Sequence, residues 1–565
     1  MNARKTLLFI FIFTVLFSSC GTPQPPPPDT NSPTEENPPP PDTSTEAEPL
    51  PTDETSLWIG WTSGPDSPNP FIAQWAQSYD IFDMVYSTMY RLQPGGTYTP
   101  DLVESSEVSA DGRIWTFKIR SGIQFHDGNP LTAQDVAFSL NLYGFFGEIR
   151  ATDSTTVQIS LTNPIPNMEG HLLFQYILPQ HIWARYENSL TTFDNLEMIG
   201  SGPFKMVIYQ QDSFVQLTAV TDHYLYTPNI TDVIYLVHED ENALVEAIQN
   251  GDVDMIQTLP FVSAESLANE ANVEVVTGLP LYPTFEEIIF NQIDPEDCPT
   301  EEGGVCSGHP ALRDRNVRIA LAHATDKSQF IDQILLGAGD PGISIVPTGL
   351  DNYYNATIQD FAYDPTLANQ ILDQAGYLDT DGDGVREMPD DGNDQALRPL
   401  RFRFSYVGPS EFYTQLTEIL SQQWNEIGIA LDVLEMTSET ILVACCPGFD
   451  YDIIVWTWDV SPEPGPVFDI MSTKEIPTSL NETGYSNPNY DILNAVQYTE
   501  INDEKRIELL WEMQRIAHDD VVEIVLFYAQ SVQAYRTDRF TGWITDAPHL
   551  ALEDFSSIIQ IEPVK

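Results

Sequence analysis

Residues 113–140 constrain the fold more than any other segment, because a strand, a turn and a helix start follow one another there. Over residues 114–119, large apolar side chains fall on every second position, a period of two that is typical of a β-strand. Gly122 marks a turn, and Thr132 with Asp135 three residues later has the pattern of a capped helix N-terminus. Similar mixtures of strand and helix patterns recur along the chain, so we expect α/β lobes.

The beginning of the chain has the composition of an export signal. Two basic residues precede an apolar stretch, residues 7–17, which is too short to span a bilayer. Two serines and Cys20 follow, an arrangement that resembles the box at which lipoproteins are cleaved and lipidated. We therefore expect residues 1–20 to be a lipoprotein signal peptide and Cys20 to carry the lipid. An ordinary signal peptide with an incidental cysteine is the alternative.

Residues 21–56 have the composition of a tether. They hold twelve of the chain's 43 prolines and few apolar side chains. A segment of this kind cannot bury enough surface to fold, so we expect it to be disordered and extended. A lipid followed by a proline-rich tether suits a protein held on the extracytoplasmic face of a cell membrane, on its periplasmic or extracellular side.

The net charge excludes one class of function. The chain has 84 acidic and 24 basic side chains, which give a formal net charge of −60. Such a surface offers no basic patch for nucleic acid. No apolar run beyond the signal is long enough to cross a membrane. About 510 residues follow the tether, which is too many for one hydrophobic core and predicts two or three lobes.

Several short motifs together resemble one protein family. Residues 113–136, RIWTFKIRSGIQFHDGNPLTAQDV, resemble the signature of the family 5 extracellular solute-binding proteins, which are the receptors of peptide and nickel ABC importers. Further segments resemble motifs of the same family, in order, over residues 57–560: residues 100–103 (PDLV), 200–204 (GSGPF), 316–326 (NVRIALAHATD), 370–377 (QILDQAGY), 424–433 (WNEIGIALDV) and 506–516 (RIELLWEMQRI).

The resemblance implies a fold and a domain plan. The fold is an α/β, type II periplasmic-binding-protein-like clamshell with mixed sheets flanked by helices, and the ligand is enclosed between two lobes. We expect lobe I over residues 57–290, with a subdomain inserted at about residues 90–199. Lobe II is expected over residues 291–530, and residues 531–565 are expected to return to lobe I.

Four cysteines remain beyond Cys20, and four cysteines allow three pairings. Cys298 and Cys306 bracket an acidic loop that contains proline and glycine, so we expect a local disulfide between them. Cys445 and Cys446 are adjacent, and they form either a vicinal bridge or two free thiols. The spacings do not fit a zinc site.

Residues 379–390 have the ligand spacing of an EF-hand-like cation loop. Such loops bind calcium through carboxylates at positions one, three and five, a backbone carbonyl at position seven and a carboxylate at position twelve. The alternative is an acidic turn without a cation. We predict a structural Ca²⁺ site with these ligands: Asp379, Asp381, Asp383, the carbonyl of Val385, and Asp390 in place of the usual glutamate.

The main candidate for ligand recognition is the segment Trp456-Thr457-Trp458-Asp459, which follows an apolar strand. In the peptide-binding members of the family that the chain resembles, an acidic residue in this region captures the ligand's α-ammonium. The resemblance gives this role to Asp459, with Glu463 as the second candidate. Trp456 and Trp458 lie on the same side of a strand, so we expect them to form cleft walls or a stacking face for a sugar. The alternative is a pair of core tryptophans with Asp459 capping the loop.

The sequence contains none of the catalytic signatures that we considered, among them nucleophile elbows, phosphate-binding loops and zinc-protease motifs. His126 and Asp127 have no nucleophile nearby in the sequence, and we expect them to be structural. The resemblance to the solute-binding family implies a monomeric receptor rather than an enzyme, one that binds oligopeptides and delivers them to ABC permease subunits. An oligosaccharide receptor of the same fold and, less favoured, a secreted hydrolase remain as alternatives.

Overall fold

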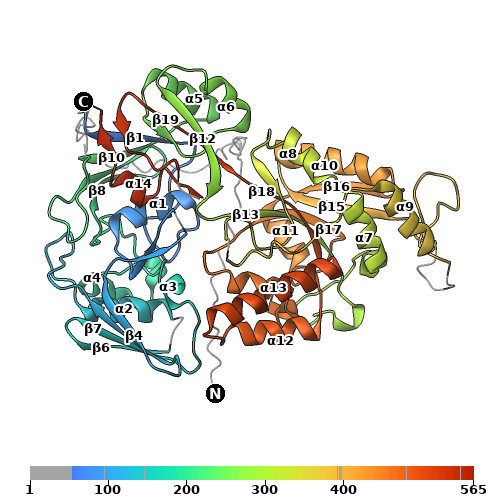
Figure 1. Cartoon of the computed structure of the whole chain (residues 1–565), viewed down its shortest axis with the longest axis horizontal. Coiled ribbons are helices and arrows are strands. Elements are labelled where there is room, and N and C mark those ends of the chain that lie inside the picture. Colours follow the sequence, from blue (N-terminus) through green and yellow to red (C-terminus); the bar gives the residue numbers. More distant parts are fainter. Residues whose placement is uncertain are drawn as a thin grey trace, which may run out of the picture.

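The computed structural model describes residues 54–564 except 95, 145–146, 351, 391, 393–396, 479 and 547–548. The predicted signal peptide with Cys20 and residues 21–53 of the predicted tether lie outside the described residues. The described chain forms two large masses side by side, each built on its own mixed β-sheet (Figure 1). Among the described helices, none combines the length and the apolar character needed to cross a bilayer.

Lobe I is built on an eight-stranded sheet to which both ends of the described chain contribute. Its inner strand β1 (Ser56–Trp61) pairs in parallel with β10 (Asp232–Val237) and β11 (Met255–Ile256). Beyond β11 come β19 (Ser531–Arg536), β12 (Val273–Pro280) and β21 (His549–Leu550), and beyond β10 come β9 (Phe214–Ala219) and β8 (Phe204–Gln210). The remaining elements of the lobe are α1 (Ala76–Val85), α5 (Glu241–Asn250), α6 (Phe261–Leu267), α14 (Phe555–Ile558) and the small sheet of β20 (Phe540–Thr541) and β22 (Glu562–Pro563).

A subdomain is inserted into lobe I between β1 and β8. It contains a four-stranded antiparallel sheet in the order β4 (Val103–Val108), β5 (Ile114–Ile119), β7 (Thr156–Ser160) and β6 (Glu148–Asp153). The predicted capped helix is confirmed as α2 (Ala133–Tyr143): Thr132 Oγ1 accepts from the amide of Gln134, and Asp135 Oδ2 accepts from the amide of Thr132. The smaller elements are the hairpin of β2 (Tyr90–Leu92) and β3 (Tyr98–Pro100), the helices α3 (Met168–His171) and α4 (Gln180–Trp183), and the 3-10 turns η1 (Ala184–Tyr186) and η2 (Leu190–Thr192).

His126 joins the loop before α2 to the turn at residues 200–204. The amide of Gly200 donates to its Nδ1 (3.3 Å), and its Nε2 lies 3.0 Å from the carbonyl oxygen of Gly202. Burial lowers the pKa of this imidazole to about 4. The two segments that resemble family motifs are therefore in contact through His126, which has a structural role in the described chain.

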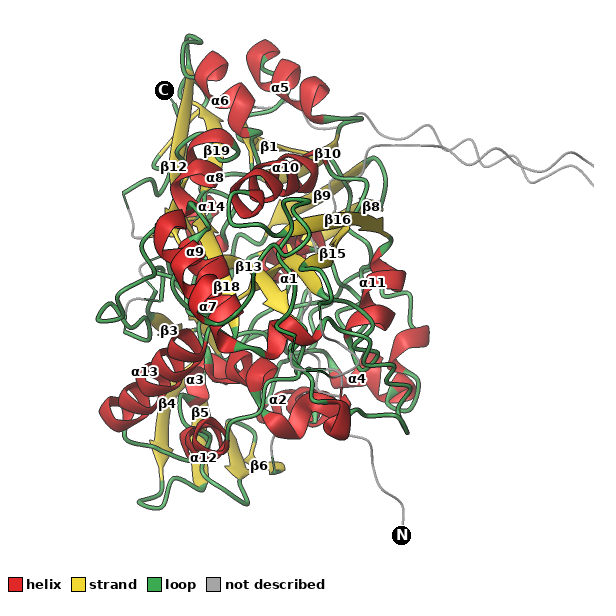
Figure 2. Cartoon of the chain, turned by 90° about the vertical axis from the view of Figure 1, so that its right-hand side faces the viewer, coloured by secondary structure: helices red, strands yellow, loops and turns green. Residues whose placement is uncertain are grey.

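Lobe II is built on a six-stranded sheet in the order β14 (Gly339–Pro341), β18 (Glu523–Ala529), β13 (Thr284–Phe290), β17 (Ile453–Asp459), β15 (Arg401–Val407) and β16 (Ala430–Met436). Its core joins these strands to several helices, and two of them, α7 and α9, lie toward the viewer in Figure 2. The helices of lobe II are α7 (Arg315–His323), α8 (Lys327–Gln333), α9 (Pro365–Gln374), α10 (Glu411–Asn425), α11 (Ser438–Cys445), α12 (Pro488–Gln497) and α13 (Asp503–Asp520), with 3-10 turns η3 (Pro295–Asp297), η4 (Pro310–Arg313), η5 (Gly465–Met471) and η6 (Thr473–Thr478).

Two chain crossings connect the lobes. β12 of lobe I continues into β13 of lobe II, and β18 of lobe II continues into β19 of lobe I. The expected boundary at residue 290 is therefore wrong by one strand, because β13 belongs to the sheet of lobe II; the crossing lies at residues 281–283. The second crossing lies at Gln530, next to the expected return at residue 531.

Both cysteine pairs are disulfides in the structure. Cys298 and Cys306 are bonded, with their Cα atoms 6.0 Å apart. Cys445 and Cys446, at the end of α11, are bonded to each other. The first pairing is the one that the sequence analysis expects, and the second is one of the two alternatives that it leaves open.

Candidate functional site

Asp459 lies where the chain enters lobe II. It is the last residue of β17, and antiparallel pairing with β13 places it opposite Thr284. The next amide, that of Val460, donates to the carbonyl of Pro283 in the crossing segment (2.9 Å). The fold therefore holds Asp459 beside one of the two connections between the lobes.

The carboxyl group of Asp459 forms no ion pair with a basic side chain among the described residues. The side chain is partly buried, and its Oδ2 is inaccessible to solvent and has no hydrogen-bond partner among the described residues. Burial raises the pKa of this carboxyl to about 7. A desolvated carboxylate is costly unless it is paired, so this position favours either a bound proton or the approach of a positively charged group.

Of the two tryptophans of β17 that we expected to form cleft walls, Trp458 is too buried for that role. Trp458 is a core side chain, only 6% exposed, and Trp456 is half-buried. They do lie on the same side of the strand, as predicted, because both indole N–H groups donate to Oε2 of Glu482, each at 3.2 Å. The indoles therefore stabilise a buried carboxyl group, and Trp458 offers no free face for stacking.

Two buried glutamates, Glu287 and Glu482, and the half-buried Glu523 form a cluster behind these indoles. Glu287, on β13, lies between Glu482 and Glu523, and it also accepts from the Trp456 indole (3.2 Å). Burial raises the pKa of all three carboxyl groups, and repulsion from Glu287 adds to the rise at Glu482 and Glu523. No ion pair joins any of them to a basic side chain in the described part of the chain, so protons must neutralise part of their charge.

Glu286 is another buried carboxyl group, 3% exposed, on the opposite face of β13 from Glu287. Thr457 donates its hydroxyl to Oε2 of Glu286, and Oε1 has no partner among the described residues. Burial raises the pKa of Glu286 to about 8. The sequence analysis missed these glutamates, although a Glu-Glu pair inside the apolar strand TFEEIIF is a signal for buried carboxyl groups.

Glu463, the second candidate for ammonium capture, is already paired with a basic side chain. Its two carboxylate oxygens accept from both terminal nitrogens of Arg506, and each of the two side chains is 3% exposed. The amide of Gly465 also donates to Oε1 (3.0 Å). Because Glu463 is neutralised from within lobe II, Asp459 is the better candidate for a ligand's positive charge.

The acidic loop lies away from this site, after α9 at the outer side of lobe II (Figure 1). Carboxylate oxygens of Asp379, Asp381, Asp383 and Glu387 come within 4.8 Å of one another. Asp390, expected as the twelfth-position ligand, is not part of this group, and Glu387 at the ninth position is. Oxygen ligands of this type and number suit calcium.

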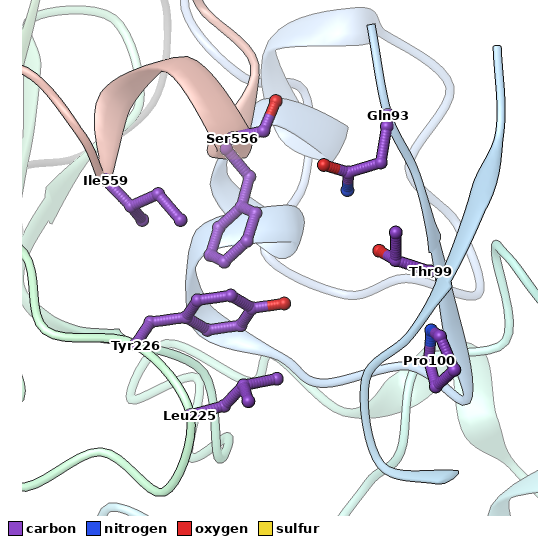
Figure 3. Close-up of a pocket in the computed structure, with 8 residues that line it drawn as sticks. Gln93, Thr99, Pro100, Leu225, Tyr226, Ser556 and Ile559 are labelled. Carbon is purple, nitrogen blue, oxygen red and sulfur yellow. The ribbon is translucent and has the colours of Figure 1, made fainter. Parts of the chain in front are cut away.

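A hollow of about 320 Å³ opens on lobe I (Figure 3). Tyr226 and Phe555 pack edge to face in it, with ring centroids 4.7 Å apart. Its lining belongs wholly to lobe I, so it is separate from the contact region between the lobes: Gln93, Thr99, Pro100, Leu225, Tyr226, Phe555, Ser556 and Ile559.

Comparison with known proteins identifies relatives along most of the chain. Residues 97–476 match the model of the bacterial extracellular solute-binding proteins, family 5. The oligopeptide-binding protein AppA of Bacillus subtilis is 26% identical over 464 residues, which cover 78% of this chain and 80% of AppA. The dipeptide-binding protein of Escherichia coli is 22% identical over 526 residues, which cover 85% of this chain and 90% of that protein.

Solved structures share the fold. The structure of Bacillus subtilis AppA in complex with a nonapeptide aligns with a TM-score of 0.71 at 23% identity, covering 90% of this chain and 99% of AppA. A periplasmic oligopeptide-binding protein from Thermotoga maritima aligns with a TM-score of 0.76 at 19% identity, covering 91% of this chain and all of the other.

Glu286 makes the stability of lobe II depend on pH. Its pKa in the folded protein, about 8, lies above its ordinary value of 4.5, so the folded state retains a proton that the unfolded state loses. This contribution is fully present below pH ~4.5 and is lost as the pH rises through ~8. We predict that Glu286→Gln flattens the fall in the free energy of unfolding between pH 5 and 9, by up to ~4 kcal/mol.

Urea unfolding at a series of pH values measures this difference. Glu418→Gln, at an exposed position on α10, is the matched control and should leave the pH profile unchanged. Parallel profiles for the wild-type protein and Glu286→Gln would show that Glu286 does not hold a proton in the folded state.

Proposed function

The chain belongs to the bacterial extracellular solute-binding proteins of family 5, and we propose that it binds oligopeptides between its two lobes and delivers them to an ABC permease. Two of its relatives are named for oligopeptide and dipeptide binding. A receptor of this kind acts outside the cytoplasm and catalyses no reaction, so the proposed cycle consists of capture, closure, docking and release.

The observation that carries the proposal is the unpartnered carboxyl group of Asp459 beside the crossing between the lobes. A peptide brings an α-ammonium group, which can donate charge-assisted hydrogen bonds to both oxygens of a carboxylate. Such a pair offsets the desolvation of Asp459, and the remaining peptide groups can bind through backbone hydrogen bonds and water.

Closure requires a ligand that binds the closed form better than the open form. The two crossings, at residues 281–283 and at Gln530, are the only covalent connections between the lobes in the described fold, so they are the proposed hinge. Because Asp459 adjoins the first crossing, an ammonium group held there also touches the hinge side of lobe II.

The oligosaccharide alternative has lost part of its support. It depended on two exposed indole faces, and Trp458, which is 6% exposed, does not offer one. The proposed ligand therefore remains a peptide.

We further propose that the mature protein is a monomer. A lipid on Cys20, which lies outside the described residues, attaches it to the membrane.

Asp459→Ala should weaken peptide binding by roughly 1.5–3 kcal/mol, the contribution of a hydrogen bond to a charged group. The test begins by passing a tryptic casein digest over the full mature chain and identifying the retained peptides by mass spectrometry. Calorimetry with one retained peptide, free and N-acetylated, then compares the wild-type protein with Asp459→Ala.

Acetylation should weaken binding to the wild-type protein and should make little difference to Asp459→Ala, because the ammonium group and the carboxylate act as a pair. Asp332→Ala, at an exposed position on α8, is the control and should bind as the wild-type protein does. Equal affinity of the wild-type protein and Asp459→Ala would remove Asp459 from the site.

We also propose that the loop at residues 379–390 holds a structural Ca²⁺. The close approach of Asp379, Asp381, Asp383 and Glu387 supports it, since four carboxylates within 4.8 Å repel one another without a cation. Val385 contributes its carbonyl in the proposed site. The position of Glu387 makes it a candidate to close the coordination shell in place of Asp390.

Chelation should lower the melting temperature by at least about 2 °C, and added calcium should restore it, because an ion that binds only the folded state stabilises that state. Asp381→Asn should abolish the response to calcium. Glu387→Gln should weaken the response more than Asp390→Asn does. A melting temperature that is the same with calcium and with chelator would rule out the site.

A further inference from the structure

Lobe II and the inserted subdomain of lobe I meet in hydrogen bonds around Glu463. Asn167, the residue before α3, donates its side-chain amide to Oε2 of Glu463 at 2.6 Å. Tyr98, on β3, donates its hydroxyl to the carbonyl oxygen of Pro462 at 3.2 Å. These bonds run from lobe I to lobe II and involve no residue of either chain crossing. They therefore exist only while the two lobes are in contact.

The acceptor is fixed by lobe II alone. Arg506, on α13, donates from both terminal nitrogens to Glu463, and Gln497 accepts from Arg506 with its side-chain and backbone oxygens. Gly465 leaves the space for this pair, because a Cβ atom there would lie 2.5 Å from a terminal nitrogen of Arg506 and 2.7 Å from Glu463 Oε1. Glu463 therefore presents Oε2 in one orientation whether or not lobe I is near.

The donor is fixed by lobe I alone. Asn167 has a left-handed backbone (φ 47, ψ 52), which asparagine tolerates, and its Oδ1 accepts from the amide of Gly170 (3.3 Å). This bond orients the side-chain amide so that Nδ2 faces Glu463 and Tyr98 Oη (3.2 Å). A Cβ atom on Gly170 would lie 2.6 Å from Nδ2, so glycine at this position leaves the space that the side-chain amide of Asn167 occupies.

We propose that Asn167, seated by Tyr98 and Gly170, and Glu463, held by Arg506, form a latch that sets how much of the protein is closed and how fast ligand leaves. Both halves are assembled before they meet, so little side-chain freedom is lost when they join. The acceptor is a charged and desolvated carboxylate, and a hydrogen bond to such a group is among the stronger ones in proteins.

The latch contains no ligand atom, which separates its role from that of Asp459. Asp459 selects the ligand, and the latch shifts the equilibrium between open and closed forms for every ligand equally. It acts in the ligand-free protein as well. Only the part of the inference that concerns ligand release rests on the proposed function.

Asn167→Asp gives a sharp test. Aspartate keeps the size, the left-handed backbone and the capping oxygen of Asn167, but it brings a second carboxylate against Glu463 in place of a donor. Asn272→Asp is the matched control, because Asn272 is an exposed residue of lobe I with a left-handed backbone (φ 67). Tyr98→Phe is a second, milder variant that removes one hydroxyl group.

Small-angle X-ray scattering of the ligand-free mature chain measures closure. We expect a larger radius of gyration for Asn167→Asp, a smaller increase for Tyr98→Phe, and no change for Asn272→Asp. Scattering from Asn167→Asp that matches the wild-type protein and Asn272→Asp would overturn the latch. Circular dichroism melting identifies a variant that has merely unfolded, and Tyr98→Phe then carries the test.

Stopped-flow measurements with a peptide retained from the casein digest supply the second arm. We expect the dissociation rate to rise about tenfold in Asn167→Asp with little change in the association rate. Unchanged dissociation would overturn the latch. If the protein retained no peptide, that result would count against the proposed function. The scattering measurements on the ligand-free protein would still test whether the latch exists.

Discussion

The central pair of strands in lobe II, β13 and β17, removes carboxyl groups from solvent without an ion pair to any basic side chain of the described chain. The pH dependence of stability and the proposed ligand site both follow from this constraint. Glu286 and Glu287 occupy the two faces of β13, and Asp459 ends β17 where the chain crosses between the lobes. Inside the lobe, Glu287 and Glu482 accept hydrogen bonds from the indoles of Trp456 and Trp458. At the end of β17, Oδ2 of Asp459 has no such donor among the described residues, and there we propose that a positively charged ligand group binds.

The chain crossing at residues 281–283, next to Asp459, is also one of the two connections about which the lobes can move relative to each other. β12 and β19 belong to one sheet, β13 and β18 to the other, and only short segments connect them. The lobes can therefore rotate about the crossings while each sheet stays intact. On the side of the inserted subdomain, Asn167 contacts Glu463, and such a rotation would separate the two residues. The proposed ammonium site and this contact between the lobes therefore use different residues of lobe II.

Much of the fold follows from local sequence patterns, because helix caps and strand alternation depend on interactions between residues that are close in the sequence. The capping pair Thr132 and Asp135 and the alternation in β5 appear in the structure as the sequence predicts. The boundary at residue 290 was wrong because β13 is buried on both faces and its own pattern does not say which sheet it joins.

The site was harder to predict, since burial and pairing depend on contacts distant in sequence. Trp458 has the sequence context of a cleft wall, yet its indole donates to Glu482, 24 residues away. The sequence alone does not distinguish Glu463 from Asp459, because both are acidic residues in the same segment. They differ in the structure because Arg506, 43 residues from Glu463, forms an ion pair with Glu463 and not with Asp459.

Calorimetry at pH 6 in two buffers of different ionisation enthalpy tests the central claim most directly. Because the pKa of Asp459 in the free protein is about 7, binding of a peptide ammonium group should release nearly one proton, and Asp459→Asn should abolish that release. Peptide binding without proton release from the wild-type protein would contradict the account.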